Sequence, residues 1–177
     1  MSLEKKLTPY KNIFLDRDGI INNIIMRDET VSSPRTLDEF QFTDHIFEFV
    51  ESLHIAKKEI FVVSNQPDIA RKKMDIRELN KMTRKIEKEL KIENIAYCIH
   101  DDEDCCDCRK PKPGLINNFI KEFNLMNAES ILIGDSHKDI EAAKNANISS
   151  ILLSTYYNSY IENSIECTHI SSLRDLL

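Results

Sequence analysis

The chain has 177 residues, of which 41% are hydrophobic and 31% are charged, and its formal net charge is −6 at pH 7. This length and composition suit a soluble globular chain, and we expect residues 1–177 to form a single domain. The acidic balance offers no basic surface for nucleic acid, and no apolar run approaches the ~18 residues of a membrane span. The N-terminus also lacks the apolar core of a signal peptide. We therefore predict a cytoplasmic protein, a monomer by default, without nucleic-acid or membrane partners.

Strand-like and helix-like segments alternate along the chain. Short apolar runs predict strands, and apolar residues at helical spacing predict helices. The predicted strands are 12–15, 60–63, 95–98, 131–133 and 151–153. The predicted helices are 44–58, 75–91, one that Pro113 opens, one around 140–144 and a short one near Leu173. This alternation implies right-handed crossovers, so the expected fold class is α/β, with a three-layer α/β/α, Rossmann-like arrangement around a mostly parallel sheet.

Two local patterns add detail to these elements. Asp75, with Glu78 three residues later, predicts a capping box at the start of the helix 75–91. The stretch 20–42 is polar and irregular, and it is long for a plain loop. We expect this stretch to be a binding loop or a small cap, with no large cap elsewhere in the chain.

Polar residues stand where the predicted strands end. They are Asp16 and Asp18 after the first strand, Ser64 after the second, and Asp135 with Asp139 after the fourth. The carboxyl ends of parallel strands are where ligands bind, and neighbouring acids there repel each other unless a proton or a cation lies between them. Oxygen ligands favour Mg²⁺. With Lys110, this set contains the groups for phosphoryl transfer through a phospho-aspartate, although Asp16–Gly19 alone could also be a solvated turn.

Four of the five cysteines lie within residues 98–108, and Cys167 lies apart. In a reducing cytoplasm such a cluster indicates a metal site more than a disulfide framework. Three thiolates and one imidazole make a closed Cys₃His set that is typical of structural Zn²⁺, and the proposed ligands are Cys98, His100, Cys106 and Cys108. By spacing alone Cys105 could replace Cys106, and the thiols could also be free or form a redox pair. A zinc-binding loop at 98–108 would hold Arg109 and Lys110, which follow it directly, against a phosphate.

Several segments, in this order, resemble the haloacid dehalogenase-like phosphatases. The motifs are Phe-Leu-Asp-Arg-Asp-Gly at 14–19, Ser-Asn-Gln at 64–66, Ile-Ala-Arg at 69–71, Cys-Ile-His at 98–100, Cys-Asp-Cys-Arg-Lys-Pro-Lys-Pro-Gly at 106–114, and Gly134-Asp135 with Asp139. The more similar subfamily is that of the D-glycero-D-manno-heptose 1,7-bisphosphate phosphatases and the histidinol-phosphate phosphatases. The resemblance extends over nearly the whole chain and implies the haloacid dehalogenase-like fold.

The resemblance also implies a role for each matching residue. Asp16 is the expected nucleophile, and Asp18 is the expected general acid and then base. The expected Mg²⁺ ligands are Asp16, Asp135 and Asp18, the last through its main-chain carbonyl. Ser64 and Lys110 would stabilise the phosphoryl group, and Asp139 would orient Lys110 or the metal site. The expected substrate contacts are Asn65, Gln66, Arg71 and Arg109, and the zinc ligands are the four residues named above.

The substrate is less well defined, because the match departs from the heptose branch at some positions. Asp68 stands where that branch has glycine, Ser136 where it commonly has lysine, and Ile20 where threonine is usual. The short zinc loop is more similar to the histidinol-phosphate branch, whereas Ile-Ala-Arg at 69–71 favours the heptose branch. We expect a small phosphorylated metabolite as partner: heptose 1,7-bisphosphate, with removal of its 7-phosphate, or alternatively histidinol phosphate or another sugar phosphate.

The sequence is also compatible with functions of other classes. A non-catalytic, zinc-stabilised binding module would keep the same fold, and a phosphotransferase or phosphonate-cleaving relative would need an additional base or acceptor site. His137, Arg27 and Arg35 could contact an anionic substrate, although each could equally occupy a solvated surface position.

Overall fold

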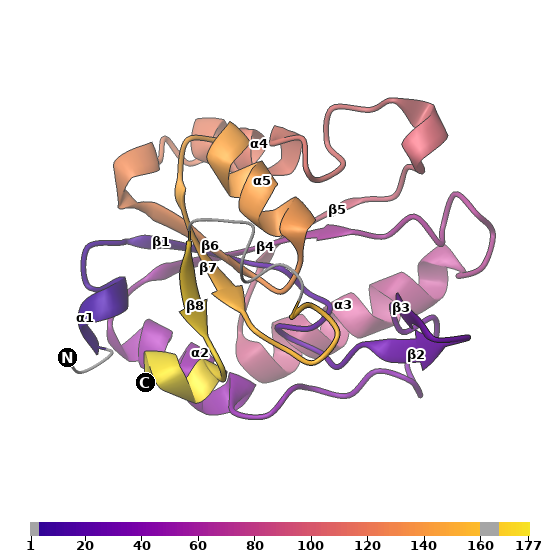
Figure 1. Cartoon of the computed structure of the whole chain (residues 1–177), viewed down its shortest axis with the longest axis horizontal. Helices are drawn as coiled ribbons and strands as arrows, with labels where there is room; N and C mark the ends of the chain where they lie inside the picture. Colours follow the sequence, from indigo (N-terminus) through magenta and orange to yellow (C-terminus); the bar gives the residue numbers. More distant parts are fainter. Residues whose placement is uncertain (1–3, 160–166) are drawn as a thin grey trace.

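The computed structural model describes residues 4–159 and 167–177. Its centre is one parallel sheet of six strands in the order β5-β4-β1-β6-β7-β8 (Figure 1). The strands are β1 (Asn12–Leu15), β4 (Glu59–Asn65), β5 (Asn94–Cys98), β6 (Ser130–Gly134), β7 (Ser149–Leu153) and β8 (Thr168–Ile170). β1 lies between β4 and β6, with Leu15 level with Val62 on one side and Ile133 on the other. The predicted α/β class with a mostly parallel sheet is therefore confirmed.

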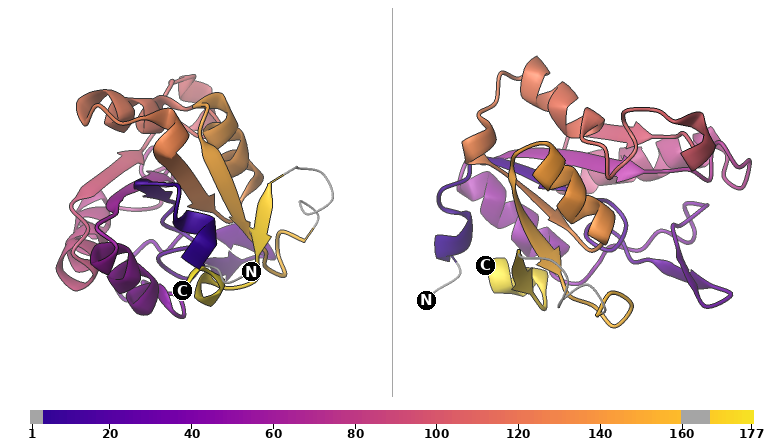
Figure 2. Two further views of the ribbon diagram at one scale, coloured as in Figure 1. Left: turned by 90° about the vertical axis from the view of Figure 1, so that its left-hand side faces the viewer. Right: turned by 45° about the horizontal axis from the view of Figure 1, so that its top comes forward.

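Helices cover both faces of the sheet, which gives three layers (Figures 1 and 2). On one face lie α2 (Ile46–Ile55) and α3 (Ile76–Leu90), and on the other α4 (Gly114–Glu122) and α5 (His137–Asn145). The short elements are α1 (Glu4–Leu7) and the 3₁₀ helices η1 (Asp102–Asp104), η2 (Asn127–Glu129) and η3 (Leu173–Leu176). Because alternate strand residues point to opposite faces, the buried side chains form two main clusters, one under each helical layer.

The amphipathic helix α3 forms where its apolar spacing predicts it, and Leu79, Met82 and Ile86 are buried. Asp75 is its N-cap and accepts a hydrogen bond from the main-chain N–H of Arg77. The predicted capping box, however, is wrong. The carboxylate of Glu78 accepts instead from the main-chain N–H of Leu37 at 2.9 Å and pairs with Lys81. The Glu78 carboxylate, which the local spacing assigned to the helix end, is therefore used by a main-chain N–H from a distant loop.

The stretch 20–42 is more regular than its composition predicts. It contains a two-stranded antiparallel hairpin, β2 (Ile25–Arg27) and β3 (Thr30–Ser32), which projects from one end of the molecule (Figure 1). The turn residues Asp28 and Glu29 both have positive φ, 49° and 61°, the combination that a tight two-residue turn requires. Among the described residues no large cap is present, as expected, and the hairpin is the one regular element of the stretch expected to be a binding loop or a small cap.

Three other boundaries differ from the predictions. Helix α2 is shorter than 44–58, because His45 and Lys57 adopt left-handed φ values of 63° and 54° that interrupt the helix. The three-residue strand β8 was not predicted, since such a short run carries little periodicity. The helix near Leu173 is the single 3₁₀ turn η3. In the described part of the chain, no helix has the length and apolarity to cross a membrane.

The face under α4 and α5 is held by packed aromatic rings, and this gives a direct test of the fold. The ring of Phe61 lies 5.0, 5.1 and 5.3 Å from those of Phe14, Phe119 and Phe123. We predict that Phe61→Ala lowers the free energy of unfolding by about 3–5 kcal/mol, because it leaves a cavity among these rings. Ile55→Ala, at a position that is 77% exposed, should change it by less than about 0.5 kcal/mol. Equal urea midpoints for Phe61→Ala and the unchanged protein would contradict this packing.

Candidate active site

Four of the predicted site residues, Asp16, Asp18, Ser64 and Asp135, lie at the carboxyl ends of β1, β4 and β6. The three strands are adjacent and parallel, so the residues after them face the same crevice. A pocket of about 250 Å³ opens there. Its lining residues are Asp16, Asp18, Ile24, Val31, Ser32, Ser33, Ser64, Asn65, Pro67, Arg109, Lys110, Asp135, Ser136 and Lys138. The strand-end acids in this set were predicted from the sequence, whereas Ser33 and Lys138 were not.

Three buried carboxylates and one buried ammonium form the centre of the site. Asp16, Asp135 and Asp139 each offer an oxygen within 4.8 Å of the others. The Nζ of Lys110 lies 2.9 Å from Asp16 Oδ1 and 2.5 Å from Asp139 Oδ1, and it also donates to the main-chain oxygen of Val63. The other oxygen of Asp139 accepts from the main-chain N–H of the residue that caps α5. Asp139 is therefore in direct contact with Lys110, as the expected role of orienting that lysine requires.

The charges of this cluster do not balance. Burial, followed by the charge of Asp139, raises the pKa of Asp16 to about 7, although Lys110 acts in the opposite direction. Burial and the charges of Asp16 and Asp139 also raise the pKa of Asp135 well above its usual value. Burial opposes the charge of Lys110, but Asp139 and Asp16 outweigh it and raise the pKa of that ammonium. Excess buried negative charge with oxygen-only donors fits a hard divalent cation such as Mg²⁺, which Asp16 and Asp135 could hold.

The carboxylate of Asp18 is held apart from this trio. Arg17 donates to its Oδ1 from Nε and Nη2 at 3.1 and 2.8 Å, and Asn22 donates to the same oxygen. Ser33, from the segment after the hairpin, and Gln66 donate to Oδ2. Burial opposes ionisation of Asp18, but the charge of Arg17 and these hydrogen bonds lower its pKa. Asp18 is thus an ionised carboxylate at the pocket wall, and only its main-chain oxygen remains to serve as the expected metal ligand.

The three residues of the Ser-Asn-Gln motif lie in different positions. Ser64 lines the pocket. The amide of Asn65 bonds both main-chain groups of Lys110, at 2.9 and 3.0 Å, and so holds that residue in place. Gln66 is fully buried and donates to Asp18 and Ser64. Asn65 and Gln66, expected as substrate contacts, therefore have protein partners in this structure.

Two residues that the sequence did not indicate hold Asp135. The phenol of Tyr157 donates to Asp135 Oδ2 at 2.6 Å, and Asn158 donates to the main-chain oxygen of Asp135 at 2.7 Å. Burial and the nearby Asp135 raise the pKa of Tyr157, which keeps its phenol a donor. Both residues lie after β7 in a stretch without periodicity, so no sequence signal pointed to them. Gly19, with φ +84°, packs against Asp135 and Tyr157, and a Cβ there would lie 1.9 Å from Asp135 Oδ2.

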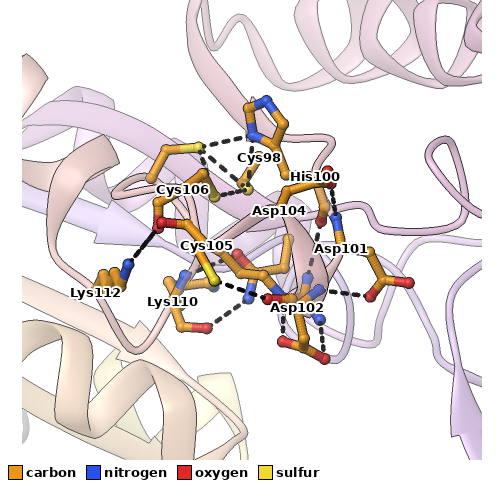
Figure 3. Close-up of polar contacts among 12 residues, drawn as sticks. Cys98, His100, Asp101, Asp102, Asp104, Cys105, Cys106, Lys110 and Lys112 are labelled. Atoms are coloured by element: carbon orange, nitrogen blue, oxygen red, sulfur yellow. Dashed lines mark hydrogen bonds and ion pairs between the residues drawn. The ribbon is translucent and has the colours of Figure 1, made fainter.

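The expected zinc ligands converge in a second cluster beside the pocket (Figure 3). The sulfur of Cys98 lies 3.6 Å from that of Cys106 and 3.2 Å from that of Cys108, and His100 Nδ1 lies 3.2 Å from Cys108 Sγ. A tetrahedral Zn²⁺ with Zn–S bonds of about 2.3 Å places its sulfurs roughly 3.8 Å apart, so the cluster fits such an ion. Cys105 is exposed, and its thiol points to the main-chain oxygen of a residue in η1 (Figure 3). The geometry thus selects Cys106 over Cys105.

Two arginines expected to contact substrate form ion pairs with the loop that carries the cysteine cluster. Arg109 lines the pocket, and its Nε donates to Asp102 Oδ1 at 2.6 Å. Arg71 is not among the lining residues, and its guanidinium makes a bidentate contact with Asp101 at 2.6 and 2.5 Å. The two acids are neighbours in the loop, so these pairs connect it with the residues after β4 on one side and with the pocket on the other.

The other candidate contacts are engaged elsewhere. Arg27 pairs with Glu39, which lies beyond the hairpin, and Arg35 pairs with Asp68, the residue at the usual glycine position. His137 pairs with a residue one turn along α5 and does not line the active-site pocket. The structure therefore places none of these three candidates, Arg27, Arg35 or His137, at the acid cluster.

Comparison with known proteins places this geometry in context. A sequence model of the family "Haloacid dehalogenase-like hydrolase" matches residues 15–153. The D-glycero-beta-D-manno-heptose-1,7-bisphosphate 7-phosphatase of Neisseria meningitidis serogroup A is 38% identical over 137 residues, covering 75% of this chain and 71% of that protein. The corresponding beta enzyme of Helicobacter pylori strain J99 is 31% identical and covers 96% and 98%. The D-glycero-alpha-D-manno-heptose-1,7-bisphosphate 7-phosphatase of Campylobacter jejuni is 36% identical and covers 81% of each chain.

Solved structures agree with these relatives. The crystal structure of D,D-heptose 1.7-bisphosphate phosphatase from B. bronchiseptica, complexed with magnesium and phosphate, matches with a TM-score of 0.83. Its sequence is 26% identical, and the match covers 94% of this chain and 95% of that one.

The unbalanced charge leads to a prediction about stability. The folded-state pKa of Asp16 lies above its ordinary value of 3.8, so its ionisation destabilises the fold as the pH rises from 3.8 through about 7. We predict that Asp16→Asn is more stable than the unchanged protein at pH 8 without Mg²⁺, by up to about 4 kcal/mol. The gain should shrink as the pH falls towards 4. Urea unfolding of the two zinc-loaded proteins at several pH values measures this difference in stability. An Asp16→Asn variant that is less stable than the unchanged protein at pH 8 would refute the charge imbalance.

Proposed function

The chain belongs to the haloacid dehalogenase-like hydrolase family, and on that premise we propose that it is a Mg²⁺-dependent phosphatase of D-glycero-D-manno-heptose 1,7-bisphosphate that removes the 7-phosphate. The observation that carries the proposal is the position of Asp16, which lies buried beside Asp135 and 2.9 Å from the ammonium of Lys110. This carboxylate contacts the fixed ammonium of Lys110 and lies beside a site for a divalent cation. Two positive charges that offset the repulsion between anions make it suited to attack a phosphate dianion. The choice of substrate is based on the named activity of relatives that are 31–38% identical to this chain.

In the proposed reaction, an oxygen of Asp16 attacks the phosphorus of the 7-phosphate. The bond between phosphorus and the sugar oxygen breaks, and that oxygen takes a proton from Asp18. Water then attacks the phosphoryl group on Asp16 and gives its proton to Asp18, which releases inorganic phosphate and restores Asp16. Ser64 and Lys110 would donate hydrogen bonds to the equatorial oxygens in both steps.

Asp18 must hold a proton for the first step, although its pKa is lowered in the free protein. A bound phosphate dianion supplies the missing cause, because a nearby like charge favours the neutral form of a carboxyl group. The four side chains that bond the Asp18 carboxylate also keep that carboxylate at the wall of the pocket, apart from the carboxylates of Asp16 and Asp135. This separation lets one acid act as nucleophile and the other as proton carrier.

Mg²⁺ would be held by Asp16, Asp135 and the main-chain oxygen of Asp18. When bound, it would neutralise charge that develops on the phosphoryl oxygens. Lys110, which is fixed between Asp16 and Asp139, would supply a second positive charge to the phosphoryl group.

We also propose that the Cys₃His cluster holds a structural Zn²⁺. All four positions of a tetrahedral ion would be filled, so its role would be to shape the loop. Cys108 directly precedes Arg109 and Lys110, and the loop contacts Arg109 again through Asp102. Arg109 and Lys138 line the pocket and would attract the second phosphate of the substrate.

A substrate comparison tests the proposed activity. We predict Mg²⁺-dependent release of phosphate from heptose 1,7-bisphosphate with a higher kcat/KM than from histidinol phosphate, because Arg109 and Lys138 attract a second phosphate. Both anomers belong in the assay, since the relatives include enzymes named for each. Asp16→Asn should lower kcat by at least about 10³-fold with zinc content unchanged. A higher kcat/KM on histidinol phosphate would overturn the substrate, and an active Asp16→Asn would overturn the nucleophile.

The zinc assignment has its own matched pair of variants. We predict that Cys106→Ser loses the bound zinc and most activity, because structural zinc contributes roughly 10–16 kcal/mol to the folding of comparable small sites. Cys105→Ser, one residue away, should keep both. Elemental analysis of the purified proteins gives the zinc content. Retained zinc in Cys106→Ser together with lost zinc in Cys105→Ser would reverse the ligand assignment.

A further inference from the structure

Asp135 is held by a segment that is distant in sequence. The turn after β7 brings Tyr157 and Asn158 to the end of β6, where both bond Asp135, one to its side chain and the other to its main chain. The phenol contact to Oδ2 measures 2.6 Å and the amide contact to the main-chain oxygen 2.7 Å. The backbone and the carboxylate of Asp135 are therefore fixed by the same turn.

This turn is itself rigidly built. Asn158 is buried, and its Nδ2 also donates to the main-chain oxygen of Leu153 at 2.8 Å, at the end of β7. Its Oδ1 accepts from the main-chain N–H of Thr155 at 2.7 Å, which closes the turn. The ring of Tyr157 packs edge-on against that of Tyr156, with centroids 5.2 Å apart. The phenol consequently has a fixed position from which to donate.

The turn that follows β1 leaves room for this contact. Gly19 lies against both partners, and a Cβ there would come within 1.9 Å of Asp135 Oδ2 and 2.9 Å of the Tyr157 hydroxyl. Gly19 also has φ +84°, a conformation that side chains disfavour. The phenol, the carboxylate and the glycine thus form one close-packed contact beside Asp16.

From this contact we propose that Tyr157 is a positioning residue for the divalent cation. Its hydrogen bond fixes the orientation of the Asp135 carboxylate and keeps lone pairs on that group directed at the cation shared with Asp16. Outer partners of this kind orient metal ligands, and their loss typically weakens metal binding by about 10–100-fold. The inference deepens the proposed function and rests on its assignment of Asp135 as a Mg²⁺ ligand.

Tyr157→Phe removes only the hydroxyl and keeps the ring. We expect Mg²⁺ to bind this variant about 10–100-fold more weakly, measured by titration calorimetry on zinc-loaded protein without substrate. At saturating Mg²⁺, kcat should return to near that of the unchanged protein, because Tyr157 is not among the residues that line the active-site pocket. Tyr156→Phe is the matched control, since that side chain is 77% exposed and lies one residue away. It should bind Mg²⁺ as the unchanged protein does.

A second measurement, the rise in Tm on adding Mg²⁺, does not depend on how stable each variant is without Mg²⁺. The rise in Tm that Mg²⁺ causes in each protein, relative to its own Mg²⁺-free form, reports affinity even when a variant is less stable. Equal affinity and equal Tm rise in Tyr157→Phe and the unchanged protein would overturn the inference alone. Equal weakening in both tyrosine variants would overturn it too. An unchanged protein that binds no Mg²⁺ would overturn the proposed function, and the inference with it.

Discussion

The ammonium group of Lys110 is the interaction on which the site depends. It lies between the carboxylates of Asp16 and Asp139 and donates to the main-chain oxygen of Val63. Without this charge, three acids would be buried together at the end of the sheet with no ion pair to any other described residue. Asn65 holds the main chain of Lys110 on both sides. The lysine thus places a fixed positive charge in the pocket at the carboxyl end of the sheet.

Lys110 neutralises only part of the negative charge of the three carboxylates. The charge that remains is the reason to expect a divalent cation beside Asp135. Asp16 is in contact with Lys110, whereas Asp135 is in contact with a phenol, a weaker donor. Burial therefore raises the pKa of both acids in the absence of a cation. For this reason we expect the protein without a bound divalent cation to be less stable than the protein with one, as is common where function requires buried charge. The loop that carries the Cys₃His cluster is joined directly to this part of the site, because its last cysteine, Cys108, precedes Arg109 and Lys110.

Much of this arrangement could be predicted from the sequence, for identifiable physical reasons. Buried parallel strands are continuous apolar runs, and polar residues at their carboxyl ends must meet at one edge. Asp16, Asp18 and Asp135 could be located in this way. Strand ends do not determine side-chain orientation, so the separation of the Asp18 carboxylate from the other two appears only in the structure.

The features that were missed depend on long-range contacts or on backbone that propensity disfavours. The hairpin turns at two non-glycine residues with positive φ, which composition does not indicate. Glu78 bonds the distant Leu37 in place of its own helix end. Tyr157 and Asn158 lie in an irregular turn, and their relation to Asp135 exists only after β7 has paired with β6.

The central claim is that the Asp16 carboxylate becomes covalently phosphorylated. It is tested most directly by acid quenching of the enzyme during turnover of heptose 1,7-bisphosphate, followed by borohydride reduction and peptide mass spectrometry. Reduction of an acyl phosphate converts the aspartate to homoserine, which marks the residue that carried the phosphoryl group. We predict homoserine at position 16, and only when Mg²⁺ is present. Homoserine at position 18, or active turnover with an unmodified Asp16, would contradict the claim.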